Sequence, residues 1–81
     1  MNLIDYTTFL VSSIVKNAEL VKVSSFGSDE GNTILEVIVS DEDKSKVIGK
    51  NGVTIKAIKT MVQAYAYIHD LGKVNINVDS F

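Results

Sequence analysis

The segment VIGKNGVTIKAI contains two glycines, Gly49 and Gly52, that enclose Lys50 and Asn51. Glycine has no Cβ, so it adopts backbone conformations with positive φ and lets another backbone approach closely. A lysine at the tip attracts phosphate, and the free N–H groups at the start of a following helix favour anions. The spacing therefore predicts a tight corner that can hold the phosphates of a nucleotide chain. The alternative is a corner in which the glycines only turn the chain.

The charged residues are divided unevenly along the chain. The formal net charge of −2 by itself argues weakly against nucleic acid as a partner. However, residues 1–43 contain eight acidic residues and two lysines, whereas residues 44–81 contain six lysines and two acidic residues. Five lysines and no acidic residue lie between Lys44 and Thr60, the stretch that holds the glycine corner. Besides Lys50, we expect three of these lysines to contact phosphate: Lys46, Lys56 and Lys59.

Other residues that could carry chemistry are few. Asp41, Glu42 and Asp43 follow Ser40, a pattern typical of a serine N-cap with acidic residues in the first helical turn. A carboxylate cluster for a metal or for catalysis is the alternative for these acids. His69 is the only histidine and cysteine is absent, which leaves few residues for catalysis or metal binding. His69 lies on an apolar stripe near a helix end, so we expect it to pack there. We expect no catalytic constellation, no metal and no cofactor, and therefore no enzyme.

The hydrophobic pattern predicts six elements in the order helix, strand, strand, helix, helix, strand. A turn at residues 27–31 joins the first two strands into a hairpin, and Gly72 ends the long helix that precedes the last strand. The predicted bounds are residues 3–17, 19–26, 32–40, 41–49, 52–70 and 73–79.

The long helix carries two apolar stripes that we expect to have different partners. The first stripe, which we expect to pack on the sheet, contains Ile55, Ile58, Val62, Tyr65 and His69. The second stripe, which we expect to pack on the first helix or to form a dimer interface, contains Ala57, Met61, Ala64 and Ile68.

Four of the six aromatic residues fall into two groups, and the other two, Phe26 and Phe81, have no evident ligand role. Tyr6, Phe9 and Tyr65 lie on apolar stripes and are predicted to be core residues. Tyr67 lies on the polar face of the long helix, with Thr60 and Gln63, and is the aromatic side chain with the best case for contact with a base.

Length and composition indicate one ordinary globular domain. The chain has 81 residues, of which 46% are hydrophobic and 22% charged, and we expect a single domain over residues 1–81. No stretch approaches the roughly 20 apolar residues that a membrane span needs, so we expect no membrane partner. The absence of cysteine and of a signal sequence makes the cytoplasm the expected location.

The glycine corner and its isoleucines resemble the signature of the K-homology (KH) RNA-binding domain, an Ile-Gly-x-x-Gly-x-x-Ile-x-x-Ile pattern. Its positions are matched by Ile48, Gly49, Gly52, Ile55 and Ile58. The element order resembles type II KH domains, which implies an α+β fold: a three-stranded mixed sheet with three helices on one face. A chain of this size is similar to the small bacterial KhpA group, also called YlqC-like.

This resemblance implies how RNA would be held. In KH domains the GxxG loop grips the backbone of about four unpaired nucleotides, and bases lie in an adjacent apolar groove. By resemblance, Gly49 and Gly52 permit the approach, Lys50 and Asn51 contact phosphate or sugar, and Ile48 and Ile55 line the groove. Ile58 is expected in the core beneath it. The chain has no arginine, so we expect modest affinity for single-stranded RNA and loose sequence preference.

The resemblance also implies partners and roles. It suggests a homodimer or a heterodimer with a larger KH protein of the KhpB or Jag type, and an RNA-chaperone or post-transcriptional role linked to cell shape and cell wall biogenesis. The alternative function is a protein-interaction subunit that dimerises and has little RNA affinity of its own.

Overall fold

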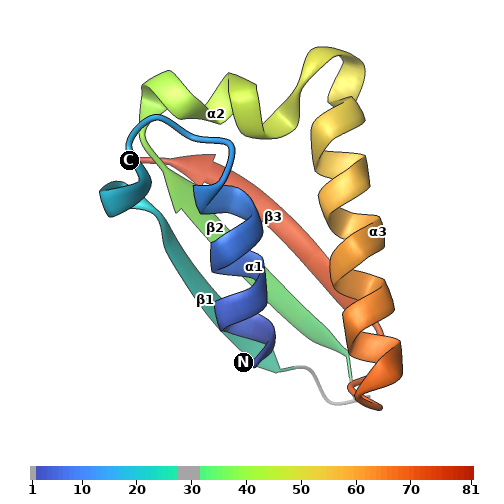
Figure 1. The fold of residues 1–81 in the computed structure, drawn as a ribbon. Helices are drawn as coiled ribbons and strands as arrows, with labels where there is room; N and C mark the ends of the chain where they lie inside the picture. Colours follow the sequence, from blue (N-terminus) through green and yellow to red (C-terminus); the bar gives the residue numbers. More distant parts are fainter. Residues whose placement is uncertain (1, 28–31) are drawn as a thin grey trace.

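A computed structural model describes residues 2–27 and 32–81, which form a sheet covered on one side by helices (Figure 1). The strands β1 (Lys22–Gly27), β2 (Thr33–Val39) and β3 (Val74–Ser80) lie in the order β1-β2-β3. β1 pairs antiparallel and β3 pairs parallel with β2. The helices α1 (Leu3–Ser12), α2 (Asp41–Ile48) and α3 (Val53–Ile68) lie on the same face of this sheet. The predicted α+β fold with a mixed sheet is confirmed.

The core lies between the sheet and the helices. Side chains of a strand alternate between its faces, so β2 turns Leu35, Val37 and Val39 toward the helices, and all three are buried. In the neighbouring strand Ile76 pairs with Leu35 and is also buried, as the alternation predicted. The helices contribute Val11, Val47, Ile58, Val62 and Ala66. Burying one such valine or leucine contributes about 1.5–3 kcal/mol.

The first helix is shorter than its hydrophobic pattern predicted. It begins after Asn2, whose side chain accepts a hydrogen bond from the backbone of Asp5, and it ends at Ser12 instead of residue 17. At this end the Ser13 hydroxyl bonds back to the carbonyl of Phe9, which competes with helix continuation. A 3-10 turn at Ala18–Leu20 follows, so β1 begins at Lys22 and not at residue 19.

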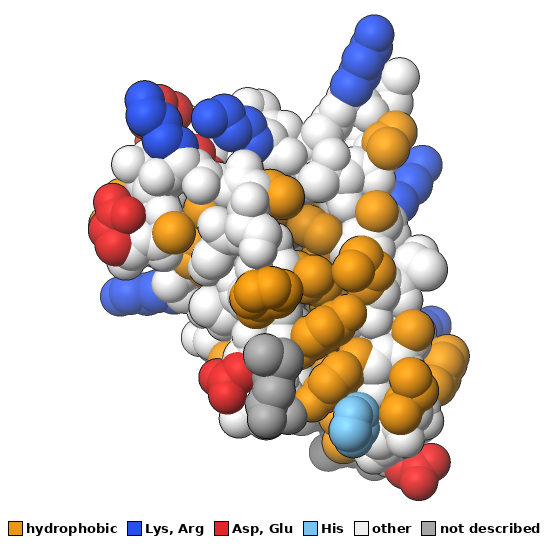
Figure 2. Space-filling model, viewed as in Figure 1, with side chains coloured by type: hydrophobic (Ala, Val, Ile, Leu, Met, Phe, Trp, Pro, Cys, Tyr) orange, Lys and Arg blue, Asp and Glu red, His pale blue; other side chains and the backbone are white. Residues whose placement is uncertain are grey.

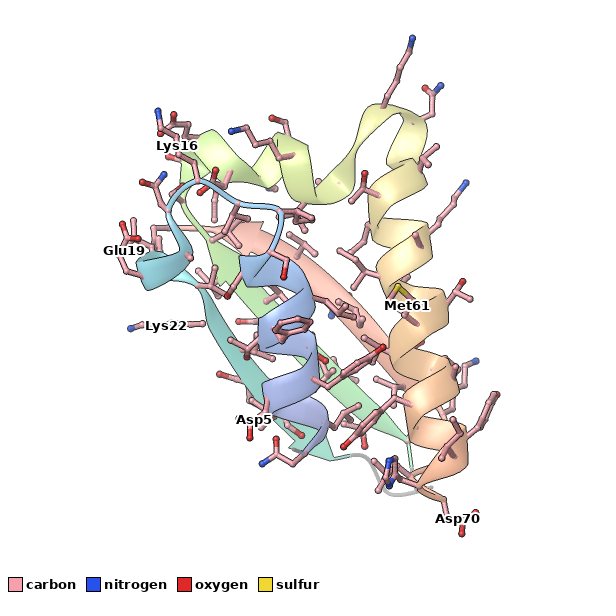
Figure 3. The ribbon with its side chains drawn as sticks, in the orientation of Figure 1. Asp5, Lys16, Glu19, Lys22, Met61 and Asp70 are labelled. Carbon is pink, nitrogen blue, oxygen red and sulfur yellow. The ribbon has the colours of Figure 1, made fainter. Side chains whose placement is uncertain are left out.

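A buried carboxylate holds the chain beyond α1. Asp43 of α2 accepts hydrogen bonds from the backbone N–H groups of Lys16, at 3.0 Å, and Asn17, at 2.8 Å. Figure 3 shows Lys16 beside the start of α2. Because the two amides bind Asp43, they are not available for further helical hydrogen bonds, and α1 cannot extend to residue 17.

The same carboxylate belongs to the predicted helix start. Ser40 is the N-cap of α2 and accepts a hydrogen bond from the backbone of Asp43, which confirms the predicted cap. Burial would raise the pKa of the Asp43 carboxyl, but hydrogen bonds from Lys16, Asn17 and Ser40 outweigh it and lower the pKa from 3.8 to about 2. Asp43 is therefore a structural residue, which joins α2 to the segment after α1.

The buried face of α1 also differs from the prediction. Thr7 and Val11, four residues apart, are buried, whereas Phe9 is 59% exposed, so the expectation of Phe9 as a core residue is wrong. Two residues at 100° each place Phe9 on nearly the opposite side of the helix from Thr7. Tyr6 is half-buried against the core.

The end of α3 uses an aspartate where a glycine was expected. The helix ends at Ile68, and Asp70 adopts the left-handed conformation, with φ of 56°. The Leu71 N–H then bonds to the carbonyl of Ala66 at 2.8 Å, and Gly72 also has a positive φ.

Two further predictions concern the turn of the hairpin and membrane-spanning helices. The hairpin pairing of β1 with β2 is observed, but residues 28–31 of its predicted turn lie outside the described residues. Among the helices of residues 2–27 and 32–81, none combines the length and the hydropathy needed to cross a membrane.

Candidate functional site

The glycine corner lies where α2 and α3 meet, at one apex of the molecule (Figure 1). The Gly49 N–H bonds to the carbonyl of Ser45 and ends α2, and a 3-10 turn at Lys50–Gly52 leads into α3. Gly49, Asn51 and Gly52 all have positive φ angles, of 77°, 56° and 74°. Asparagine tolerates the left-handed conformation better than most residues, which accounts for Asn51 between the glycines. The predicted corner is confirmed.

The two glycines are needed for different reasons. A Cβ placed on Gly49 would meet the side chain of Thr54 and would stand 2.8 Å from its backbone nitrogen, so no side chain fits there. A Cβ on Gly52 would find its nearest neighbour, Ile55 Cγ2, at an ordinary 3.9 Å. Gly49 is thus required by space and by conformation, and Gly52 by conformation alone.

The tip of the corner is open to solvent and free of negative charge. Lys50 and Asn51 are exposed. The first turn of α3 contains no acidic residue, and its N-cap, Gly52, has no side chain to bond the helix amides. The positive end of the helix dipole is therefore not neutralised locally, as a phosphate-binding corner requires.

The lysines around the corner are placed unequally. Lys46, Lys56 and Lys59 are exposed, and Figure 2 shows basic side chains at separate points along the upper edge and the side of the molecule. Lys44, in contrast, forms an ion pair with Asp79 of β3, with 3.4 Å between Nζ and Oδ1. The N–H of Ser80 and then this lysine lower the pKa of Asp79. Lys44 thus links α2 to the sheet, a role that its place in the basic stretch did not indicate.

The apolar residues of the motif form a gradient of burial beside the corner. Ile48 and Ile55 are half-buried, while Ile58, one turn further along α3, is only 5% exposed. Ile55 also packs against the core. The expectation that Ile58 belongs to the core is confirmed, and Ile48 and Ile55 are the isoleucines of the motif that retain accessible surface.

The polar face of α3 runs from the corner toward the start of β3. Gln63 ties this face to the strand, because its side chain donates to the carbonyl of Gly72 and accepts from the N–H of Val74, both at 2.9 Å. An open hollow of about 420 Å³ lies beside it. Its lining residues are Lys59, Thr60, Gln63, Ala64, Tyr67 and Val74. The sequence pattern indicated the polar face but not this hollow, which depends on the position of β3.

The second stripe of α3 is uncovered. All four of its residues, Ala57, Met61, Ala64 and Ile68, are exposed, so α1 does not pack on them. Instead α1 meets α3 through a stack of Tyr6 on Tyr65, with ring centroids 4.7 Å apart, and His69 lies 4.3 Å from Tyr65. His69 thus packs on Tyr65 near the helix end as expected, but it is exposed and is not part of the core against the sheet. Apolar side chains gather over α1 and α3 in Figure 2, and Figure 3 shows Met61 on this face.

A metal centre finds no support in the described part of the chain. Within residues 2–27 and 32–81, no three histidine, cysteine, aspartate or glutamate residues are grouped so that they could hold a metal ion. Asp41 and Glu42 are exposed, and Glu42 pairs with Lys16 at 3.4 Å.

Comparison with known proteins agrees with this geometry. The family model described as the KH domain of KhpA/KhpB matches residues 5–78, which include all three helices except the first two residues of α1. The chain belongs to the KhpA/KhpB KH-domain family. The resemblance drawn from the glycine–isoleucine motif is confirmed.

Relatives in this family come from several organisms. A Thermotoga maritima protein is 42% identical over 55 residues, which cover 68% of this chain and 72% of the relative. A Borreliella burgdorferi protein is 38% identical over 65 residues, covering 80% of this chain and 78% of the relative. A Clostridium perfringens protein is 46% identical over 57 residues, covering 70% of this chain and 75% of the relative. Each of the three is named RNA-binding protein KhpA.

Solved structures with a similar fold include the GTP analogue complex of Era. The crystal structure of Era with MgGDPNP and nucleotides 1506–1542 of 16S ribosomal RNA matches 98% of this chain with a TM-score of 0.74 and 16% sequence identity. Aquifex aeolicus Era bound to GDP.AlF4- matches 96% of it, with a TM-score of 0.69 and 15% identity. This KH chain spans about 30% of the first protein and 29% of the second, and the likeness establishes its fold alone.

Proposed function

We propose that this KH-domain protein binds single-stranded RNA at the corner between α2 and α3. The observation that carries the proposal is the corner itself: two glycines with positive φ enclose the exposed residues Lys50 and Asn51, at the uncapped start of α3. A sugar–phosphate chain can approach such a backbone closely, and lysine, asparagine and helix amides suit its phosphates. Relatives of 38–46% identity are named RNA-binding proteins.

The proposed binding path continues from the corner to the neighbouring side chains. Lys46, Lys56 and Lys59 add positive charge on both flanking helices, while Ile48 and Ile55 offer apolar surface to unpaired bases. Bases contribute through stacking and apolar contact, and the backbone contributes through charge, so affinity should depend strongly on salt. Without arginine the chain lacks bidentate phosphate contacts, which favours modest affinity and weak sequence preference.

The finer biological role rests on the family. We propose an RNA-chaperone or post-transcriptional role in the cytoplasm, linked to cell shape and cell wall biogenesis. The chemistry of the corner supports such a role because grip on the backbone, with little readout of bases, suits many RNA targets.

A second function is favoured by a separate observation, the exposed stripe of α3. We propose that Ala57, Met61, Ala64 and Ile68 pack against the same stripe of a second copy, or against a larger KhpB or Jag-type partner. A two-fold dimer uses the same surface on both subunits, and an apolar helix face such as this stripe can pack on its own copy. A dimer would place two RNA sites side by side and raise the effective affinity. In the alternative function, the protein dimerises through this interface and has little RNA affinity at the corner.

The experiment that separates the two functions is residue-resolved. Backbone amide chemical shifts are recorded while single-stranded RNA is added to the protein. Binding at the corner should shift the amides of Gly49–Gly52 and of the first turn of α3 most strongly. Shifts confined to the exposed stripe, or none at saturating RNA, would contradict RNA binding at the corner.

A further inference from the structure

The hollow between α3 and β3 lies outside the glycine corner and has walls of different character. Tyr67 and Thr60 come from α3, and Val74 begins β3. Gln63 fixes the two elements against each other through its bonds to Gly72 and Val74, so the hollow has a defined shape. Its volume of about 420 Å³ lies in the range of small-ligand sites, but it is open along one side.

Tyr67 is the feature of this hollow that most needs an explanation. Its side chain is 64% exposed on the polar face of a helix, away from the Tyr6–Tyr65 stack that joins α1 to α3. A large aromatic ring left in water contributes nothing to the core, whereas its face is a platform on which any nucleobase can stack. An open hollow suits this use, because a stacked base enters from one side and keeps its sugar and phosphate in water.

The hollow and the corner lie on one continuous face. Lys56, Thr60, Gln63 and Tyr67 follow each other at spacings of three and four, so they form a single row along α3. The row starts in the first helical turns after the corner, and exposed Lys59 is the first residue of α3 in the lining of the hollow. At a rise of 1.5 Å per residue, the fourteen steps along the helix from Val53 to Tyr67 span about 21 Å. That length corresponds to about six nucleotides at the 3.4 Å spacing of stacked bases.

From this arrangement we propose that the hollow is a second contact for the same RNA strand, in which one base stacks on Tyr67 while Lys59 contacts the adjoining phosphate. The inference rests on the proposed binding of RNA at the corner. It extends the bound stretch of RNA beyond the length that a KH corner grips, about four nucleotides. The site takes a single-stranded nucleotide of any base, because stacking does not depend on a base's hydrogen-bonding edge.

The test compares RNA length with the identity of residue 67. Oligouridines of about four and about ten nucleotides are titrated against the wild-type protein, Tyr67→Ala and Tyr67→Phe, with fluorescence anisotropy as the readout. The wild type should bind the longer RNA more tightly. Tyr67→Ala should weaken binding of the longer RNA about tenfold and leave the shorter RNA unchanged. Tyr67→Phe keeps the ring and should restore the wild-type affinity.

A matched control separates this contact from a general effect of exposed aromatic residues. Phe26 in β1 is 53% exposed and lies outside the hollow, so Phe26→Ala should leave both affinities unchanged. An unchanged affinity of Tyr67→Ala for the longer RNA, or an equal loss for both lengths, would overturn the inference while RNA binding at the corner stands. Failure of the wild type to bind either RNA would overturn both.

Discussion

Thr54 lies against Gly49 so closely that the corner admits no side chain at that glycine. An added Cβ would stand 2.8 Å from the Thr54 backbone nitrogen, and Gly49 also has φ of 77° and ψ of 169°, a region populated almost only by glycine. This contact joins the end of α2 to the first turn of α3. The approach of the two helices and the requirement for glycine at position 49 therefore have one structural cause.

The unequal demands on the two glycines predict unequal mutations. Gly49→Ala should lower the free energy of unfolding by about 3 kcal/mol or more, because strain and a clash with Thr54 add. Gly52→Ala meets no clash and should cost about 1–2 kcal/mol for its left-handed backbone alone. Urea denaturation of the two variants measures the difference. Equal losses would show that the contact with Thr54 is not tight in solution.

Reversal of charge at the tip should abolish binding without unfolding the protein. Lys50 and Asn51 are exposed, so changing both to aspartate removes no packing and should change the melting temperature little. Two carboxylates at the start of α3 would repel phosphate, and RNA affinity should fall below detection in an anisotropy titration. A comparable loss of thermal stability would instead make the corner a structural element.

The buried carboxylate of Asp43 predicts a pH-dependent contribution to stability. Its pKa is lowered in the folded protein from 3.8 to about 2, so the folded state favours the ionised form. This contribution is present above about pH 4 and is lost as the pH falls toward 2. Asp43→Asn should lower the melting temperature clearly at pH 7, and the difference from the wild type should shrink between pH 4 and pH 2.

The control for this prediction is Asp41→Asn, which removes an exposed carboxylate from the same helical turn. Its effect on the melting temperature at pH 7 should be much smaller than that of Asp43→Asn. A difference between wild type and Asp43→Asn that stays constant from pH 7 to pH 2 would contradict the account of Asp43.

The exposed stripe of α3 predicts a change in mass. Ile68 is 77% exposed, so Ile68→Glu should not disturb the folded chain. In a dimer through the stripe, however, it would bury a carboxylate in an apolar contact, which is strongly unfavourable. Light scattering at fixed concentration should show a lower mean mass for the variant. A mass equal to that of the wild type would exclude this face as the interface.

The features that the sequence predicted correctly depend on neighbouring residues. Gly49 and Gly52 turn the chain through their own backbone freedom. Ser40 caps a helix whose first three residues are acidic, and Val74, Ile76 and Val78 alternate within one strand. Such signals are local, and the KH motif adds spacing that few other structures share. The element order, the sheet and the corner could therefore be predicted before any contact was known.

The features that were missed depend on residues far apart in the chain. The end of α1 is set by Asp43, which is 27 residues from Lys16, and no local pattern shows that bond. Lys44 was counted with the other lysines because its partner, Asp79, lies 35 residues away. The hollow beside Tyr67 likewise requires Val74 of another element. These relationships arise only when the helices and the sheet pack together.

The most direct test of the central claim is a titration of short unstructured RNA with the purified protein at several salt concentrations. If the corner grips about four phosphates, the logarithm of the binding constant should fall against the logarithm of salt with a slope of about −3. Affinity should then drop about fifty-fold between 50 and 200 mM salt. Saturable binding with this slope is the predicted result. Absence of binding at low salt, or binding that does not change with salt, would contradict the account.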